Sequence, residues 1–316
     1  MVPPSPFSSF FARQGVVILD GGLATALESL GHDLDDPLWS ARVLLDAPES
    51  VQRVHQAYLA AGADCIATVT YQATFEGFRR RGLSDGEAEA LFLRAVALAV
   101  EARDAFWADV SNRRGREKPM VAASIGPYGA FLADGSEYTG RYDLDEDGLV
   151  SWHRRRWHLL AGTEVDLMAC ETLPSLAEGR ALLRLLEETP DRWAWLSFQC
   201  ADERHLADGS LLADAARACE GVEQVAAVGV NCVAPRLVAP LLQAAREGTT
   251  RPLVAYPNSG EVYDASSRTW RPGVPGGDLV GKASAWRARG ATVLGGCCRT
   301  GPGTIAALRR SLLDTL

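Results

Sequence analysis

The sequence has no excess of positive charge and no long uncharged apolar run. Its 316 residues include 32 Lys and Arg against 40 Asp and Glu, for a formal net charge of −8. This balance argues against non-specific binding to nucleic acid. The most apolar long window, residues 90–100, contains Arg94 and is shorter than the roughly 20 residues of a membrane-spanning helix. We therefore expect neither a nucleic-acid partner nor a membrane partner.

The first 15 residues lack the pattern of a secretory signal. They contain three prolines and no basic region followed by an apolar core. The seven cysteines of the chain, an odd number, suit a reducing compartment better than a disulfide framework. The sequence predicts a cytoplasmic protein with an N-terminal extension over residues 1–15 and one domain over residues 16–316.

Short apolar runs alternate with amphipathic stretches eight times along the chain. The runs cover residues 16–20, 65–70, 120–125, 166–170, 194–199, 226–231, 252–257 and 291–296. Helical patterns cover residues 48–61, 85–108, 146–162, 175–188, 210–220, 235–246, 278–289 and 302–314. Near-continuous apolar strands are typical of parallel sheets covered on both faces. Eight βα units predict a TIM (β/α)8 barrel, with a doubly wound open sheet as the alternative.

Glycines and long loops mark the ends of these elements. Gly62, Gly162 and Gly290 each follow a helical pattern and are predicted to be left-handed helix caps. Three connections that follow strands are long, namely residues 22–47, 126–146 and 258–277. In barrels the active site forms where strands end, so we expect these loops to act as lids or substrate walls.

Three of the cysteines lie where predicted strands end. Cys232 directly follows the run 226–231, and Cys297 and Cys298 follow the run 291–296. Strands six and eight of a barrel are next-but-one neighbours, so their ends lie roughly 10 Å apart at ~4.8 Å per strand. Three thiolates with an open fourth position form a catalytic zinc site. The alternative is a vicinal disulfide or a set of unreactive buried thiols. No histidine pair has metal-ligand spacing.

Other strand ends carry groups suited to an amino acid. Asp20 with the backbone N–H groups of Gly21 and Gly22 offers an anion for an ammonium group and donors for a carboxylate, although Asp20 as a turn cap is the alternative. Glu171 adds a second acid at the same face, unless it forms only a surface ion pair. Thr68 belongs to a run of hydroxyls and an amide that could orient a polar ligand.

Four motifs together make the sequence resemble the homocysteine S-methyltransferase family. They are Asp20-Gly21-Gly22, Gly229-Val230-Asn231-Cys232, Tyr256-Pro257-Asn258-Ser259-Gly260-Glu261 and Gly295-Gly296-Cys297-Cys298. The resemblance covers residues 16–303 and is strongest to the short bacterial and plant branch that uses S-methylmethionine or S-adenosylmethionine. It implies a TIM barrel that holds Zn²⁺ through Cys232, Cys297 and Cys298. It also implies that homocysteine is bound by Asp20, Gly21, Gly22, Thr68, Glu171 and Asn231.

The expected reaction is attack of the homocysteine thiolate on the methyl group of a sulfonium donor. Aromatic faces favour such a cation. We expect the donor pocket to include Tyr71, Gln72, Tyr256 and Asn258, with Trp39, Tyr138 and Tyr142 as further aromatic candidates.

The alternatives are a betaine-dependent enzyme, a methyltransferase for selenocysteine or another thiol, and a non-catalytic barrel that binds zinc or an amino acid. The betaine-using branch carries more aromatic residues after the second strand than the segment Thr70-Tyr71-Gln72-Ala73-Thr74 does, and it has a C-terminal assembly arm for which this sequence shows no counterpart. Both differences argue against the betaine branch, and we expect a monomer.

Overall fold

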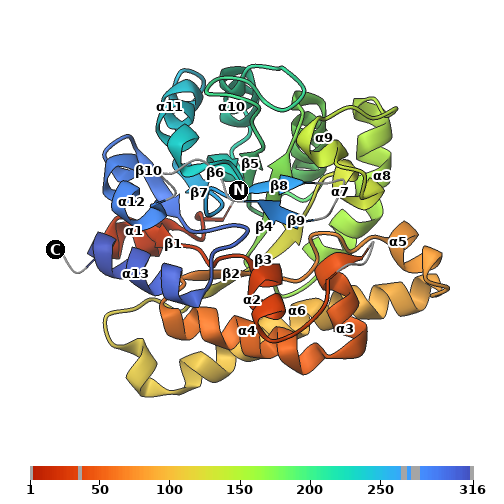
Figure 1. Ribbon diagram of the computed structural model, residues 1–316, viewed down its shortest axis with the longest axis horizontal. Coiled ribbons are helices and arrows are strands. Elements are labelled where there is room, and N and C mark those ends of the chain that lie inside the picture. The colour runs from red at the N-terminus through yellow and green to blue at the C-terminus, as the bar shows by residue number, and fades with distance from the viewer. Residues whose placement is uncertain (1–2, 35–37, 265–268, 272–277, 314–316) are drawn as a thin grey trace.

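Eight parallel strands form a closed barrel in the computed structural model, which describes residues 3–34, 38–264, 269–271 and 278–313 (Figure 1). They are β1 (Val17–Ile18), β2 (Cys65–Ala67), β3 (Met120–Ile125), β4 (Leu167–Leu173), β5 (Ala194–Phe198), β6 (Val225–Asn231), β7 (Leu253–Tyr256) and β10 (Ala291–Leu294). Their spatial order is β1-β10-β7-β6-β5-β4-β3-β2. The two ends of this order meet, because Leu19 pairs with Cys65 and Asp20 N–H donates to Cys65 O at 3.0 Å. The predicted TIM barrel is confirmed, and the open sheet is excluded.

Eight long helices surround the strands (Figure 1). They are α4 (Pro48–Ala61), α6 (Asp85–Ala108), α8 (Glu146–Ala161), α9 (Leu176–Glu187), α10 (Leu212–Glu220), α11 (Pro235–Arg246), α12 (Leu279–Arg287) and α13 (Pro302–Leu313). None of the helices in the described part of the chain is both long and apolar enough to cross a bilayer.

Two of the three predicted glycine caps are left-handed. Gly62 and Gly290 have φ values of 102° and 92°. The prediction for Gly162 was wrong, because its φ is −77°. Gly162 N–H donates to His158 O and Thr163 N–H donates to Leu160 O, so α8 ends in a tightened right-handed turn.

Alternate residues of each strand enter two separate apolar layers. Val16 and Ile18 belong to the layer between strands and helices, whereas Val17 and Leu19 belong to the layer inside the barrel. This alternation follows from the two-residue period of a strand. The interior layer also contains Trp195, which is 2% exposed.

The N-terminal helix α1 (Ser8–Gln14) packs into the barrel interior. Phe7 and Phe10 are buried in the interior layer, and the Phe7 ring stacks on Trp195 with centroids 6.2 Å apart. Buried Asp64 holds this end together by accepting hydrogen bonds from Gln14 Nε2 at 2.6 Å and Arg309 Nη1 at 2.7 Å. The residues predicted as an extension therefore contribute to the core.

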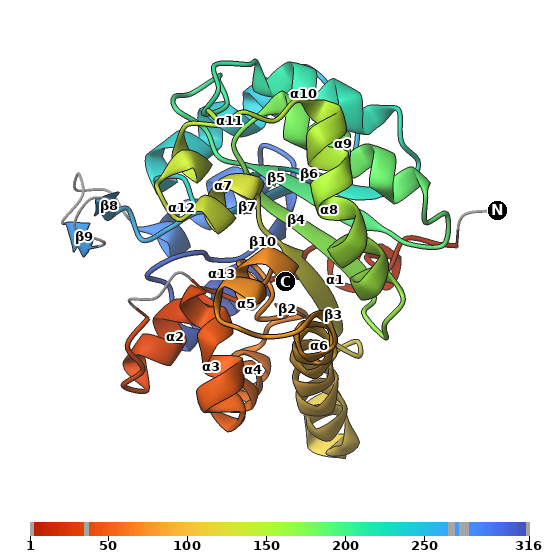
Figure 2. The ribbon, with the colours of Figure 1, turned by 90° about the vertical axis from the view of Figure 1, so that its right-hand side faces the viewer.

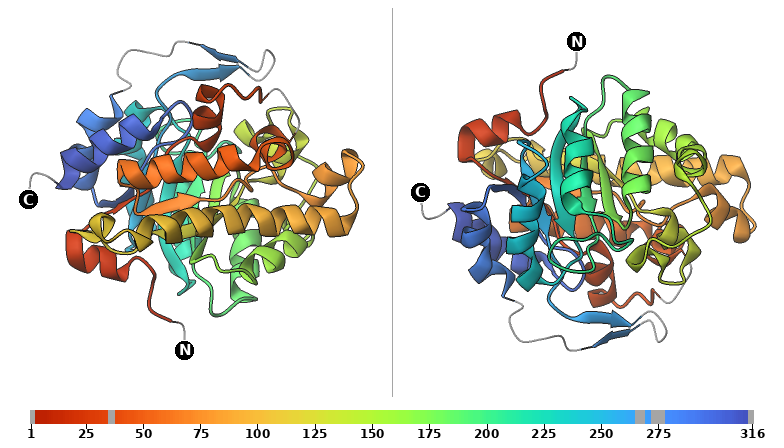
Figure 3. Two further views of the ribbon diagram at one scale, coloured as in Figure 1. Left: turned by 90° about the horizontal axis from the view of Figure 1, so that it is seen from below. Right: turned by 90° about the horizontal axis from the view of Figure 1, so that it is seen from above.

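Short elements fill the connections after strands. The first long connection contains α2 (Leu23–Ser29), η1 (Trp39–Arg42) and α3 (Val43–Asp46), and α5 (Phe75–Arg80) follows β2. The connection after β3 contains α7 (Tyr128–Leu132) and η3 (Ser136–Tyr138), and the one after β7 contains β8 (Val262–Asp264) and β9 (Thr269–Arg271). The 3-10 helix η2 (Val110–Arg113) precedes β3. Figures 2 and 3 show β8 and β9 at the opposite end of the molecule from α1.

Candidate metal centre and ligand cavity

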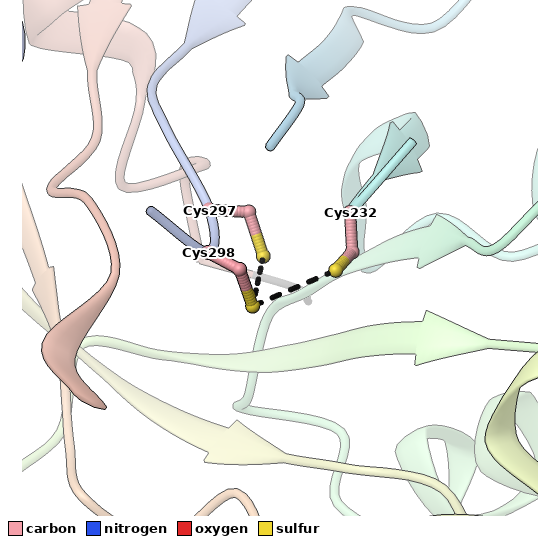
Figure 4. A group of neighbouring side chains, drawn as sticks. All are labelled: Cys232, Cys297 and Cys298. Atoms are coloured by element: carbon pink, nitrogen blue, oxygen red, sulfur yellow. Dashed lines mark hydrogen bonds between the residues drawn. The ribbon is translucent and has the colours of Figure 1, made fainter. Parts of the chain in front are cut away.

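Three free cysteines converge at the carboxyl ends of β6 and β10 (Figure 4). The Sγ atom of Cys298 lies 3.7 Å from Sγ of Cys232 and 3.9 Å from Sγ of Cys297. All three sulfur atoms lie within 4.8 Å of one another, so the group could hold a metal ion. These contacts lower the pKa of Cys232 and raise the pKa values of Cys297 and Cys298. The other four cysteines are buried elsewhere, as expected for small apolar residues.

Glycines allow the backbone to approach closely around this group. A Cβ atom on Gly229 would lie 2.0 Å from Val254 O, and one on Gly296 would lie 2.2 Å from Thr300 Oγ1. Larger residues would therefore push β6 from β7 or open the turn that carries Cys297 and Cys298. Cys232 itself has a φ of 52°, which turns its side chain out of the strand direction at the cost of local strain.

Thr300 connects the cysteine turn to the end of β1. Its hydroxyl and its N–H both donate to Cys297 O, and its carbonyl accepts from Gly22 N–H at 2.9 Å and from Tyr58 Oη at 3.0 Å. The Gly22 N–H group is thus occupied. Among the described residues, no hydrogen bond engages the N–H group of Gly21.

A cavity of about 300 Å³ opens beside the cysteines, a size typical of small-molecule sites. Its described lining contains five carboxylates and no Lys, Arg or His. Three are Asp20, Glu137 and Glu171, and the other two are Glu28 and Asp33. This one-sided charge favours a positively charged ligand.

Two acids of this cavity are Asp20, which is buried, and Glu171, which is half-buried. Asp20 Oδ2 accepts a hydrogen bond from Ala67 N–H at 2.8 Å, and Ser124 Oγ donates to Glu171 Oε1. Burial raises the pKa of Asp20 well above its usual range, and the charge of Glu171 adds to this effect. Burial likewise raises the pKa of Glu171 to about 7, with a further contribution from Cys297. A bound cation would offset this cost by stabilising both carboxylates.

Thr68 lines the cavity, but its hydroxyl proton is already used. Thr70 Oγ1 donates to Ser124 O at 2.7 Å, so the 2.7 Å contact between the two threonine hydroxyls has Thr68 as its donor. Thr68 Oγ1 also accepts from Ser124 N–H at 3.1 Å. This network fixes the Ser124 side chain that contacts Glu171.

Asn231 does not line the cavity. Its Oδ1 accepts from Thr172 N–H at 2.7 Å, and its Nδ2 donates to Thr172 Oγ1 at 2.8 Å and contacts Cys297 Sγ at 3.9 Å. Thr172 has a left-handed φ of 60°. The fully buried Asn231 therefore holds a strained turn against the cysteine group, and its expected contact with homocysteine stays a prediction.

Three of the four residues expected around the donor line the cavity, namely Tyr71, Gln72 and Tyr256. The Tyr256 hydroxyl also contacts Trp195 Nε1 and Ser197 Oγ. Asn258 is absent from the lining, because its amide bonds Cys232 O at 3.3 Å and Gly260 N–H at 2.8 Å. It supports the backbone of Cys232.

The further aromatic candidates also separate. Tyr138 lines the cavity, whereas Tyr142 donates its hydroxyl proton to Glu178 away from it. The side chain of Trp39 lies outside the described residues.

Sequence reasoning missed several residues of the site. No local pattern marks Thr300, Ser124 or Glu137, because the groups they meet are distant in sequence: Thr300 O accepts from Tyr58 Oη, Ser124 Oγ donates to Glu171, and Glu137 lines the cavity with Asp20. Only the position of Ser124 at a strand end offered a signal, which a turn explains equally well.

Three grouped thiols beside carboxylates, at the carboxyl end of a closed parallel barrel, form the kind of barrel enzyme site that could hold a metal ion and a cationic ligand. Comparison with known proteins narrows this class. The sequence profile described as homocysteine S-methyltransferase matches residues 17–312.

A homocysteine S-methyltransferase of Bacillus subtilis is 45% identical over 98% of this chain and 100% of its own length. One of Escherichia coli is 44% identical over 96% of this chain and 98% of its own. The metallated crystal structure of the Escherichia coli homocysteine methyltransferase MmuM superposes with a TM-score of 0.86 at 42% identity, covering 96% of this chain and 99% of that one. The chain belongs to the homocysteine S-methyltransferase family, which confirms the resemblance in its motifs, and it is a methyltransferase.

Proposed function

We propose that this protein transfers a methyl group from S-methylmethionine or S-adenosylmethionine to the thiol of homocysteine, with zinc held by Cys232, Cys297 and Cys298. The observation that carries the proposal is the three-thiol group beside a cavity lined by the acids Asp20 and Glu171. Tetrahedral zinc with Zn–S bonds of about 2.3 Å requires sulfur separations of about 3.8 Å. The observed contacts of 3.7 Å and 3.9 Å fit this requirement.

Asp20 and Glu171 would receive the ammonium group of homocysteine. Both acids lie close enough to Cys297 for its charge to raise their pKa values, so an amino acid held by them can direct its thiol toward the cysteines. The carboxylate finds no cation in the described lining. It would bind backbone N–H groups at Gly21 and in the first turn of α2, which lack intrahelical acceptors.

When bound, the zinc ion lowers the pKa of a thiol that it contacts and so supplies thiolate at neutral pH. The sulfur atom of homocysteine forms a bond to the methyl carbon of the donor, and the bond from that carbon to the donor sulfur breaks. The positive donor leaves as a neutral thioether, and the thiolate becomes methionine. Charge is neutralised in this step, so a cavity that excludes water favours it.

The test is methionine formation from homocysteine by reduced, zinc-loaded protein. S-methylmethionine, S-adenosylmethionine and betaine are supplied in parallel, and selenocysteine is tried as acceptor. We expect turnover with at least one sulfonium donor, and the ratio of rates identifies the preferred one. The proposal would be contradicted if protein that holds one zinc ion does not methylate homocysteine from any of the three donors. The cytoplasmic location and the monomeric state remain predictions.

A further inference from the structure

Glu137 is a carboxylate of the cavity for which the proposed reaction has no role so far. The proposed homocysteine site uses Asp20 and Glu171. Glu28 lies near a cation, since its Oε2 is 3.9 Å from Arg299 Nη1, and it is 41% exposed. Glu137, in η3, lines the cavity, and its buried Oε2 atom has no hydrogen-bond partner among the residues that the structure describes. A buried unpaired carboxylate oxygen is costly, which indicates that a ligand completes the site.

Gln72, which also lines the cavity, carries a second unpaired acceptor. Its Nε2 donates to Ala130 O at 2.8 Å, and because a carbonyl can only accept, the amide orientation is determined. Gln72 Oε1 is buried and has no hydrogen-bond partner within the described part of the chain. Two residues of the cavity lining thus each carry an unpaired acceptor.

Both residues are held against the same short helix, α7. Gln72 bonds the carbonyl of Ala130, and the neighbouring Gly129 packs so tightly on η3 that a Cβ there would lie 2.4 Å from Glu137 N. Two acceptors held at adjacent residues of one helix favour a group that carries positive charge.

Aromatic rings and the cysteine group lie near this surface. Tyr71 and Tyr138 line the same cavity as Glu137. Cys232 and the other two cysteines also line this cavity. Carboxylate, amide oxygen and aromatic faces together favour an onium cation, by Coulomb and cation–π attraction.

We propose that Glu137 and Gln72 receive the sulfonium centre of the methyl donor, and that Glu137 determines the requirement for a positively charged donor. This inference rests on the proposed function. It differs from recognition of the amino-acid end of the donor, since methionine carries the same ammonium and carboxylate groups without a sulfonium. Asp20 and Glu171 would then bind the ammonium group of homocysteine, and Glu137 would bind the sulfonium group of the donor in the same cavity.

The experiment compares wild type with Glu137→Gln, which keeps the shape of the side chain and removes its charge. For the variant we expect KM for S-methylmethionine and the inhibition constant of trimethylsulfonium to rise about 10- to 100-fold. Inhibition by methionine, the KM for homocysteine and the zinc content should change less than about twofold. Asp143→Asn, the same charge change at an exposed position of the same connection, is the matched control and should leave every value unchanged.

Two results would overturn the inference. Equal weakening of methionine and S-methylmethionine would assign Glu137 to an ammonium group, and unchanged donor constants would remove it from the site. A measurement on the unmodified protein covers the case in which the variant does not fold. Trimethylsulfonium should inhibit far better than dimethyl sulfoxide, its neutral pyramidal analogue, and equal inhibition by the two would also refute the inference. Absence of turnover in wild type would refute the proposed function instead, while trimethylsulfonium binding remains measurable by calorimetry.

Discussion

Replacing Asp20 by Asn is expected to weaken homocysteine binding without releasing the metal. Asp20 is 8% exposed and follows β1, and its Oδ2 accepts from Ala67 N–H at 2.8 Å. In the variant, the amide oxygen must take over this bond because the amide nitrogen cannot accept. The NH₂ group then faces the site proposed for the ammonium group. Two hydrogen-bond donors would face each other where the carboxylate accepts a hydrogen bond in the wild type.

The magnitude follows from the bond that is lost. A hydrogen bond to a charged group contributes about 1.5–3 kcal/mol, and 1.4 kcal/mol corresponds to about a tenfold change in binding. Homocysteine affinity should therefore fall by roughly 10- to 150-fold. Some binding should remain, because Glu171 still presents a carboxylate to the same ammonium.

The assay is titration of homocysteine in steady-state turnover, with zinc measured on the same samples. The Asp143→Asn variant again provides a matched charge control on the surface. An unchanged KM would show that Asp20 does not bind the ammonium group. Loss of zinc would instead make Asp20 a ligand or a structural support of the cysteine turn.

Three further outcomes are expected. Cys297→Ser should lose bound zinc and reduce turnover by more than about 100-fold, whereas Cys200→Ala, outside the cysteine group, should keep its zinc. A Cys297→Ser variant that binds zinc fully and is fully active would contradict the metal assignment. Inhibition by homoserine, which has no thiol to titrate, should strengthen as pH rises through about 7, because Glu171 is neutral below its raised pKa of about 7 and charged above it; the Glu171→Gln variant should lose this dependence. Phe10→Ala should lower the free energy of unfolding by about 3–5 kcal/mol, since the ring is 2% exposed inside the barrel end, while half-buried Phe11→Ala should cost less, and equal losses would refute the role assigned to α1.

The linear sequence was sufficient for the barrel and for the cysteine group. Eight apolar runs alternate with helical patterns, and parallel strands joined in this way must end at one edge of their sheet. Cys232, Cys297 and Cys298 each follow such a run, so local pattern alone predicted that their thiols converge. The two glycine-containing motifs before them were equally visible, because a close backbone approach requires glycine whatever the distant neighbours are.

Only the tertiary structure decided what each remaining group contacts. Closure depends on Leu19 meeting Cys65, and the occupied N–H of Gly22 depends on Thr300, which is 278 residues away. The side-chain amide of Asn231 bonds Thr172, and Oε2 of Glu137 has no hydrogen-bond partner in the part of the chain that the structure describes. Strand and helix periodicity arise from neighbours within a few residues and are therefore readable from sequence. The hydrogen-bond partner of each polar group, or the lack of one, depends on contacts that exist only after the chain has packed.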